Sequence, residues 1–154
     1  MKRLLFMSAV VVLLAMGILA GCSKDEILDT YNQAIQAAGD AQLTGNWSLE
    51  GKRKYGVDHY TGTYTADYEG FSGTEYLFGG TSIDREAGNK IEVICNLSIT
   101  DGTAKLVLQS GSDAPQTLIE STGYYSETIE LPPAGNYILV EGGEFTGSIE
   151  LEIK

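Results

Sequence analysis

The sequence predicts an all-β domain, a single antiparallel β-sandwich, after an apolar N-terminal segment and a short helix. From about residue 45 the chain is rich in Gly, Thr and Tyr, and apolar residues recur at every second position, which is the period of a half-buried strand. Turn residues separate these segments at short intervals, as is typical of a sandwich. Asp101-Gly102 lies between two alternating segments, where it favours a tight hairpin because a type I′ turn needs positive φ at both central residues.

Residues 1–21 have the three-part layout of a secretory signal peptide. Lys2 and Arg3 begin the segment, an apolar stretch follows, and the small residues Ala20 and Gly21 end it. The apolar stretch is long for a signal peptide and short for a membrane span, which needs roughly 17 to 25 residues. Its length alone therefore leaves both interpretations open.

The tetrapeptide Leu19-Ala20-Gly21-Cys22 resembles the lipobox of bacterial lipoproteins. That resemblance implies that a diacylglycerol alkylates the thiol of Cys22, that a peptidase cuts before it, and that the mature protein is residues 22–154. Two acyl chains hold a protein stably on a membrane, whereas one gives only marginal binding. The implied location is the extracytoplasmic face of a bacterial cell membrane, or the outer membrane if the cell has two.

The second cysteine allows a different interpretation, a disulfide between Cys22 and Cys95, because the cysteine count of an exported chain is even. Lipidation of Cys22 would instead leave Cys95 unpaired. In the segment 90–100 the apolar residues alternate onto one face together with Cys95, so Cys95 is most simply a small buried hydrophobic residue.

Residues 22–44 are expected to form the lipidated N-terminus, a short helix and a tether. Apolar residues follow helical spacings over residues 23–38, Ser23 or Asp25 can cap the start, and Gly39 can end the helix. The helix either packs partly against the domain, which we expect, or only lifts it from the membrane. Its apolar stripe comprises Ile27, Leu28, Tyr31, Ala34, Ile35 and Ala38.

The β-domain is expected to span residues 45–154, and about 110 residues suffice for one core. Alternation is plainest near the end, where Ile149, Leu151 and Ile153 are separated by charged residues. Pro132-Pro133 fits a turn, since proline donates no hydrogen bond to a strand ladder. The predicted strands are 47–50, 62–68, 74–78, 90–100, 104–109, 116–121, 125–131, 136–141 and 145–154.

The stretch "ELPPAGNYILVEGG", residues 130–143, resembles a motif of extracellular bacterial jelly-roll and sandwich domains. In that motif a Leu-Pro turn and a Gly precede a strand with an inward Tyr. The resemblance favours a jelly-roll type of sandwich, and because such domains serve many functions it implies no activity.

Charge excludes some partners. Without Lys2 and Arg3 the mature part has 8 basic and 21 acidic residues, a net charge of about −13. Nucleic acid needs a basic surface, so we predict no nucleic-acid partner. A charge of this sign also argues against direct adsorption to an anionic lipid surface. The one basic cluster, residues 52–54, is interpreted as a solvated loop.

Aromatic residues are densest between residues 55 and 78. Exposed tyrosines could stack on sugar rings or anchor a protein partner. Tyrosine also favours strands, where it would be a half-buried part of the sheet, and this structural interpretation is preferred. The candidate ligand-binding residues are Tyr55, His59, Tyr60, Tyr64 and Tyr68.

No catalytic or metal motif is present in the sequence. His59 is the only histidine, the Gly-x-Ser-x-Gly elbow is absent, and one His with one thiol is too few for zinc. We predict no cofactor, except that acidic loops offer oxygen ligands for a structural calcium ion. The candidate ligands are Asp58, Asp67, Glu69, Asp84 and Glu86.

The favoured function is therefore non-enzymatic: a membrane-anchored binding or structural module of the cell envelope, with a glycan or a protein as ligand. The alternative is a small glycosidase-like hydrolase that uses carboxylates in the loops between Asp58 and Glu86. A carboxylate pair in a cleft would favour the hydrolase, and a flat face rich in Tyr would favour binding.

Overall fold

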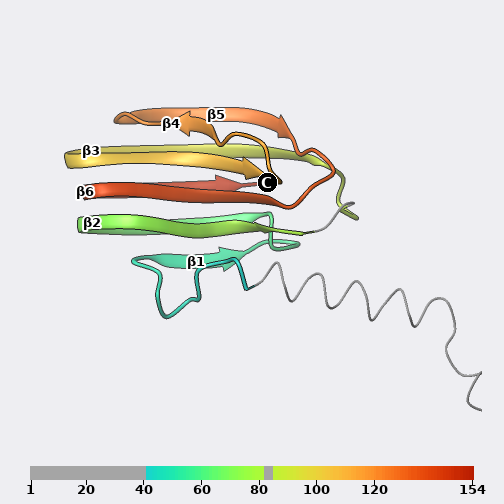
Figure 1. The fold of residues 1–154 in the computed structure, drawn as a ribbon, viewed down its shortest axis with the longest axis horizontal. Coiled ribbons are helices and arrows are strands. Elements are labelled where there is room, and N and C mark those ends of the chain that lie inside the picture. The colour runs from blue at the N-terminus through green and yellow to red at the C-terminus, as the bar shows by residue number, and fades with distance from the viewer. Residues whose placement is uncertain (1–40, 82–84) are drawn as a thin grey trace, which may run out of the picture. The chain divides into compact units, whose positions relative to one another are not determined.

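The computed structural model describes residues 41–81 and 85–154, and this part of the chain is all-β (Figure 1). The prediction of an antiparallel β-sandwich is confirmed. No helix in the described part is long and apolar enough to cross a membrane. The predicted helix, residues 23–38, and Cys22 lie outside the described residues. The strands are β1 (Lys52–Tyr55), β2 (Gly62–Gly80), β3 (Lys90–Ser110), β4 (Gln116–Ile119), β5 (Gly123–Glu130) and β6 (Asn136–Ile153).

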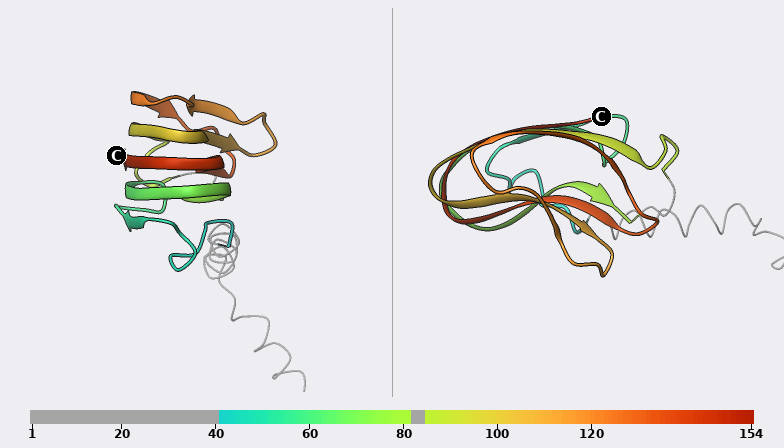
Figure 2. Two further views of the ribbon diagram at one scale, coloured as in Figure 1. Left: turned by 90° about the vertical axis from the view of Figure 1, so that its left-hand side faces the viewer. Right: turned by 90° about the horizontal axis from the view of Figure 1, so that it is seen from above.

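Three long strands build both layers of the sandwich. β2, β3 and β6 contain 19, 21 and 18 residues, and each curves from one layer into the other, as the view from above shows (Figure 2). Register shifts mark the bends of β2 at residues 68–73 and of β3 at residues 99–103. Bulges of this kind bend a strand and increase its twist, so one hydrogen-bonded sheet folds over onto itself.

The pairing defines the two layers. One layer has five strands in the order β1, first half of β2, second half of β6, first half of β3, and β5. The other has four, in the order second half of β2, first half of β6, second half of β3, and β4. β1 and β5 are thus the two edges of the five-stranded layer.

The hairpin predicted at Asp101-Gly102 is wrong. Both sides of this dipeptide pair with β6 rather than with each other, since Ile99 lies opposite Gly147 and Thr103 opposite Gly143. Gly102 does have positive φ, 71°. Asp101, however, does not have positive φ, because Glu144 is the only described non-glycine residue that does. A type I′ turn needs positive φ at both residues, so Asp101-Gly102 does not form one. The glycine serves the bend between the layers.

The first predicted strand is also misplaced. Residues 47–50 form a turn and a bend, and the strand begins only at Lys52. The basic cluster, predicted to be a loop, is therefore the edge strand β1, which pairs with residues 62–65 of β2. Lysines on an edge strand discourage pairing with a further chain.

Strict alternation places the core between the layers. In the first half of β2 the inward residues are buried and their neighbours are exposed, and the same holds for β3 and β6. Each buried aliphatic or aromatic side chain contributes roughly 1.5 to 3 kcal/mol. Side chains with almost no exposed surface include Tyr64, Phe78, Ile91, Val93, Cys95, Leu106, Val140, Phe145 and Ile149.

Asn136 holds the predicted proline turn, which connects β5 to β6. Its side-chain Nδ2 donates to the carbonyl oxygens of Pro132 at 2.9 Å and Ala134 at 2.8 Å, and its Oδ1 accepts from the Ser110 hydroxyl at 2.7 Å. Asn136 is buried, so these three bonds satisfy a polar group that would otherwise destabilise the fold.

Cys95 is buried in β3 and forms no disulfide. Burial raises the pKa of its thiol to about 12, and the thiolate is the reactive form. We expect no reaction with Ellman's reagent at neutral pH in native residues 23–154, whose one cysteine is Cys95, and one thiol per chain after unfolding in guanidinium. Rapid reaction in buffer alone would contradict this placement.

Candidate functional site

The aromatic residues proposed for ligand binding are divided between core and surface. Tyr60, Tyr64 and Tyr68 are buried, with 6%, 0% and 2% of their surface exposed. Tyr55 is half-buried and His59 is exposed, and their ring centroids lie 4.6 Å apart. Three of the five candidates therefore supply core packing, as the preferred structural interpretation expects, and of the five only Tyr55 and His59 reach the surface.

Two of the buried tyrosines bind a buried carboxylate. Glu75 is 2% exposed; its Oε2 accepts from the hydroxyls of Tyr64 at 2.9 Å and Tyr68 at 2.6 Å, and its Oε1 accepts the Glu50 amide at 2.7 Å. Burial is the main cause that raises the pKa of both tyrosines above their ordinary value, so the hydroxyls remain protonated donors. This enclosed network stabilises the core, because a buried carboxylate needs such partners.

Asp58 is the first acidic residue of the proposed hydrolase loops, and its carboxylate is hydrogen-bonded within the protein. Its Oδ2 accepts from Arg85 Nε at 2.9 Å and Nη2 at 2.7 Å, two charge-assisted hydrogen bonds to one carboxylate oxygen. Its Oδ1 accepts the amide of Tyr60 at 3.0 Å and the hydroxyl of Thr61 at 3.1 Å. Asp58 therefore ties the loop between β1 and β2 to the loop after β2, and both of its carboxylate oxygens accept hydrogen bonds within the protein.

The structure brings no metal-binding group together. Within residues 41–81 and 85–154, no three His, Cys, Asp or Glu side chains are arranged to hold a metal ion. Asp58 is paired with Arg85, Asp67 and Glu69 lie on exposed positions of β2, and Glu86 is exposed in the loop after β2. Asp84 lies outside the described residues.

The outer face of the five-stranded layer carries a row of polar side chains that the sequence did not single out. One residue from each strand lies in this row, and each is opposite its neighbour in the pairing. All five are exposed, because they alternate with the inward core residues. We call this set the outer row: Lys52, Thr65, Glu150, Asn96 and Tyr124.

Spacing and chemistry give the outer row the properties of a binding surface. Neighbouring strands lie about 4.8 Å apart, so the five positions span roughly 19 Å. Tyr124, at the β5 end, is 65% exposed and offers an aromatic ring to solvent. An amide, a carboxylate, a hydroxyl and an ammonium follow in turn, so the row combines one apolar platform with hydrogen-bond donors and acceptors.

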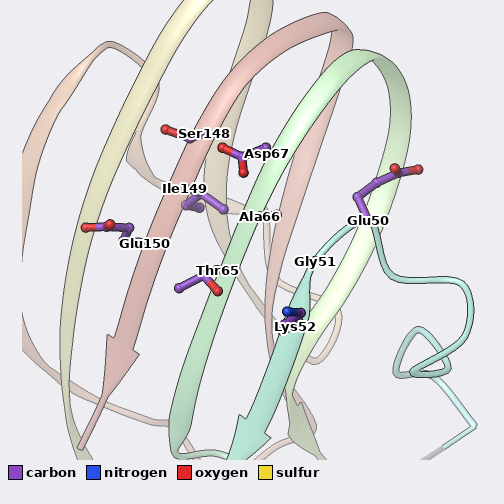
Figure 3. Close-up of a pocket in the computed structure, with 9 residues that line it drawn as sticks. All are labelled: Glu50, Gly51, Lys52, Thr65, Ala66, Asp67, Ser148, Ile149 and Glu150. Carbon is purple, nitrogen blue, oxygen red and sulfur yellow. The ribbon is translucent and has the colours of Figure 1, made fainter.

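A shallow depression of about 460 Å³ lies at the β1 end of the outer row. Figure 3 shows its side chains on the adjoining ribbons of β2 and β6, beside the start of β1. Its volume is within the range of small-ligand sites, but it is open to solvent, unlike a water-excluding enzyme cleft. The polar residues around it are Glu50, Lys52, Thr65, Asp67, Ser148 and Glu150.

Two exposed aromatic residues escaped the sequence interpretation. Tyr124 is adjacent to the half-buried Tyr125, and strand alternation assigns such neighbours to opposite faces; that signal identifies one outward Tyr without saying which. Trp47 is 98% exposed. It follows the turn residues Gly45 and Asn46, which could have indicated a loop rather than a strand.

Comparisons with known proteins place the chain in no family. No protein-family profile and no curated protein matches it. It is similar to the pre-peptidase C-terminal domain of a collagenase from Bacillus anthracis, with 17% identity over 67% of this chain and 99% of that one, at a TM-score of 0.44. Ligand-free CBM1 of BiXyn10A matches at 11% identity over 68% and 86% of the two chains, with a TM-score of 0.36. A CBM4 structure matches at 14% identity over 61% and 79%, with a TM-score of 0.30. Similarity at this level assigns no activity to the chain.

Proposed function

We propose that the protein is a bacterial lipoprotein anchored through Cys22, and that residues 45–154 form a non-enzymatic module that binds an envelope glycan. The outer row is the observation that carries the proposal. It presents an exposed Tyr124 beside Asn96 and Glu150 on an open face. A protein ligand and a purely structural role are the other forms of the non-enzymatic proposal.

The chemistry of the row suits a sugar chain. A tyrosine ring can pack against the apolar face of a pyranose with little loss of side-chain entropy. Asn96 can both donate and accept hydrogen bonds, and the Glu150 carboxylate accepts them, as sugar hydroxyls require. Because strands follow one another at about 4.8 Å, successive side chains can meet successive parts of an extended glycan.

The hydrolase alternative has less support from the described residues. Both oxygens of Asp58 are occupied within the protein, and Glu75 is enclosed by tyrosine hydroxyls. Asp67 and Glu150 lie near each other on neighbouring strands, but their face is open, and nothing there would shield a glycosyl transition state from water.

The test is a binding screen against envelope glycans with residues 23–154, which retain every described strand. Tyr124→Ala is expected to weaken binding at least about tenfold, or about 1.4 kcal/mol, as removal of an aromatic hot-spot contact does. Its stability should change by less than about 0.5 kcal/mol, since Tyr124 is exposed.

Thr128→Ala is the matched control, because Thr128 is exposed on the same face of β5, four residues away. It should bind as the unchanged protein does. If Tyr124→Ala retained full affinity for a bound glycan, the outer row would not be the binding surface. Turnover of the glycan during the assay would favour the hydrolase instead.

A further inference from the structure

Trp47 is presented to solvent on a turn that the protein holds in place. Its side chain is 98% exposed, and the turn is closed by a bond from the Ser48 amide to the Gly45 carbonyl at 2.8 Å. Trp47 is the most exposed of the large apolar side chains in the described part of the chain. A partner that covered it would bury a large aromatic side chain of the kind that anchors interfaces.

Arg53 attaches this turn to the body of the sandwich. Its Nη2 donates to the Thr44 carbonyl and to Asn46 Oδ1, both at 2.9 Å. Its Nη1 donates to the carbonyls of Tyr76 at 3.2 Å and Leu77 at 2.9 Å on the other layer. The guanidinium thus joins the segment before β1 to the edge of β2, so the position of Trp47 follows that of the domain.

A second apolar side chain lies at the other end of β1. Val57 is 84% exposed, and its amide donates to the Thr61 hydroxyl at 3.2 Å. The same loop is braced by the ion pair between Asp58 and Arg85, 2.7 Å long. Val57 is therefore also displayed from an anchored loop.

Positive charge lies between these two side chains. β1 holds three of the eight Lys and Arg residues of the mature chain. Lys52 and Lys54 are exposed, and no ion pair within the described ranges involves either of them. The acidic residues Glu50, Asp67 and Glu150 line the same depression as Lys52. We call Trp47, Lys52, Lys54 and Val57 the β1 edge patch.

We infer that the β1 edge patch contacts an anionic bilayer surface and sets the orientation of the domain on it. Tryptophan favours the interface between headgroups and acyl chains, and lysines are attracted to anionic headgroups within a Debye length. The net negative charge of the domain opposes its adsorption to an anionic surface. Contact with such a surface therefore requires a local group of basic residues, which β1 contains. The inference rests on the proposed Cys22 anchor, since a tether makes weak contacts effective through high local concentration.

The contact agrees with the proposed binding face. β1 and β5 are opposite edges of the five-stranded layer, so with β1 on the bilayer, Tyr124 lies roughly 19 Å further along the outer row. The aromatic platform then remains accessible to envelope polymers.

Trp47 is the only tryptophan, so its fluorescence reports this contact directly. The lipidated full protein is reconstituted in vesicles of equal parts phosphatidylglycerol and phosphatidylcholine, with and without brominated acyl chains. We expect a blue-shifted emission and strong quenching by the brominated lipid. Vesicle-bound protein with unshifted, unquenched Trp47 emission would overturn the inference while leaving the anchor intact. Protein recovered free of vesicles would overturn the anchor and the orientation together, and glycan binding is scored separately from both.

Two matched controls identify the cause. The Lys52→Glu, Lys54→Glu double variant should lose most of the quenching. The Lys90→Glu, Lys105→Glu double variant changes the net charge equally on β3, which does not pair with β1, and should retain it. In a Trp47→Phe protein carrying Tyr124→Trp, the tryptophan at the far edge should not be quenched. Equal quenching at both positions, or equal loss in both charge variants, would contradict a specific edge contact.

Discussion

Glu75→Ala is expected to destabilise the domain by about 3 to 5 kcal/mol, because it removes the shared acceptor of three hydrogen bonds and leaves their donors buried and unsatisfied. The substitution leaves the hydroxyls of Tyr64 and Tyr68 and the Glu50 amide without their shared acceptor. An unsatisfied buried donor costs roughly 1 to 3 kcal/mol. Urea unfolding followed by circular dichroism measures the loss, since marginally stable domains have only about 5 to 15 kcal/mol in total.

Conservative variants test the same network. Tyr64→Phe and Tyr68→Phe should each cost about 1.5 to 3 kcal/mol, the usual value of a hydrogen bond to a charged group. Their effects should not be additive, because the two hydroxyls bind one oxygen and lie 3.2 Å apart. A cost below about 1 kcal/mol for Glu75→Ala would show that the carboxylate contributes little to the fold.

Alkaline pH gives this network a second readout. Burial, the largest cause, raises the pKa of Tyr64 and Tyr68 in the folded state, so the folded protein retains protons that the unfolded chain releases. Their contribution is complete below the unfolded pKa of about 10 and is lost as pH rises above it, by at most about 1.4 kcal/mol per pH unit for each group. The buried Cys95 thiol adds a similar slope from lower pH. Every variant retains Cys95, so its slope is common to all of them. The free energy of unfolding of the Tyr64→Phe, Tyr68→Phe double variant should therefore fall less steeply with pH than that of the unchanged protein.

Alternation in the sequence predicted the faces of the strands well, but not their partners. Ile149 and Ile153 are buried as expected, because the two-residue period is a local property of a strand. The Asp101-Gly102 signal was misleading, since positive φ at the glycine serves a bend between layers as well as a hairpin. Only the long-range pairing with β6 distinguishes the two.

The candidate site was harder to predict for the same reason. Tyr64, Ala66 and Tyr68 follow one another at every second position and all are buried. This spacing shows that they lie on one face of the strand, but it does not show whether that face points inward. Glu75 breaks the hydrophobic pattern in β2, and its burial depends on two tyrosines from another part of that strand. The outer row needs five strands in register, which no local pattern in the sequence specifies.

Cys22→Ala is expected to abolish lipidation of the protein completely. The substitution removes the only thiol that the lipobox resemblance places at the cleavage site, so neither the thioether to diacylglycerol nor the following cut can occur. We expect an uncleaved precursor without acyl label when bacteria that express the variant are grown with a labelled fatty acid. Cys95→Ala is the matched control and should be labelled normally, because Cys95 is buried in β3.

The anchor, on which the proposed location and the orientation by the β1 edge patch both depend, is tested most directly by the intact mass of the protein purified from bacterial membranes. The account predicts a chain that begins at Cys22 and carries a diacylglyceryl group on that residue. A mass that includes residues 1–21, or a chain cut elsewhere with Cys22 unacylated, would contradict it.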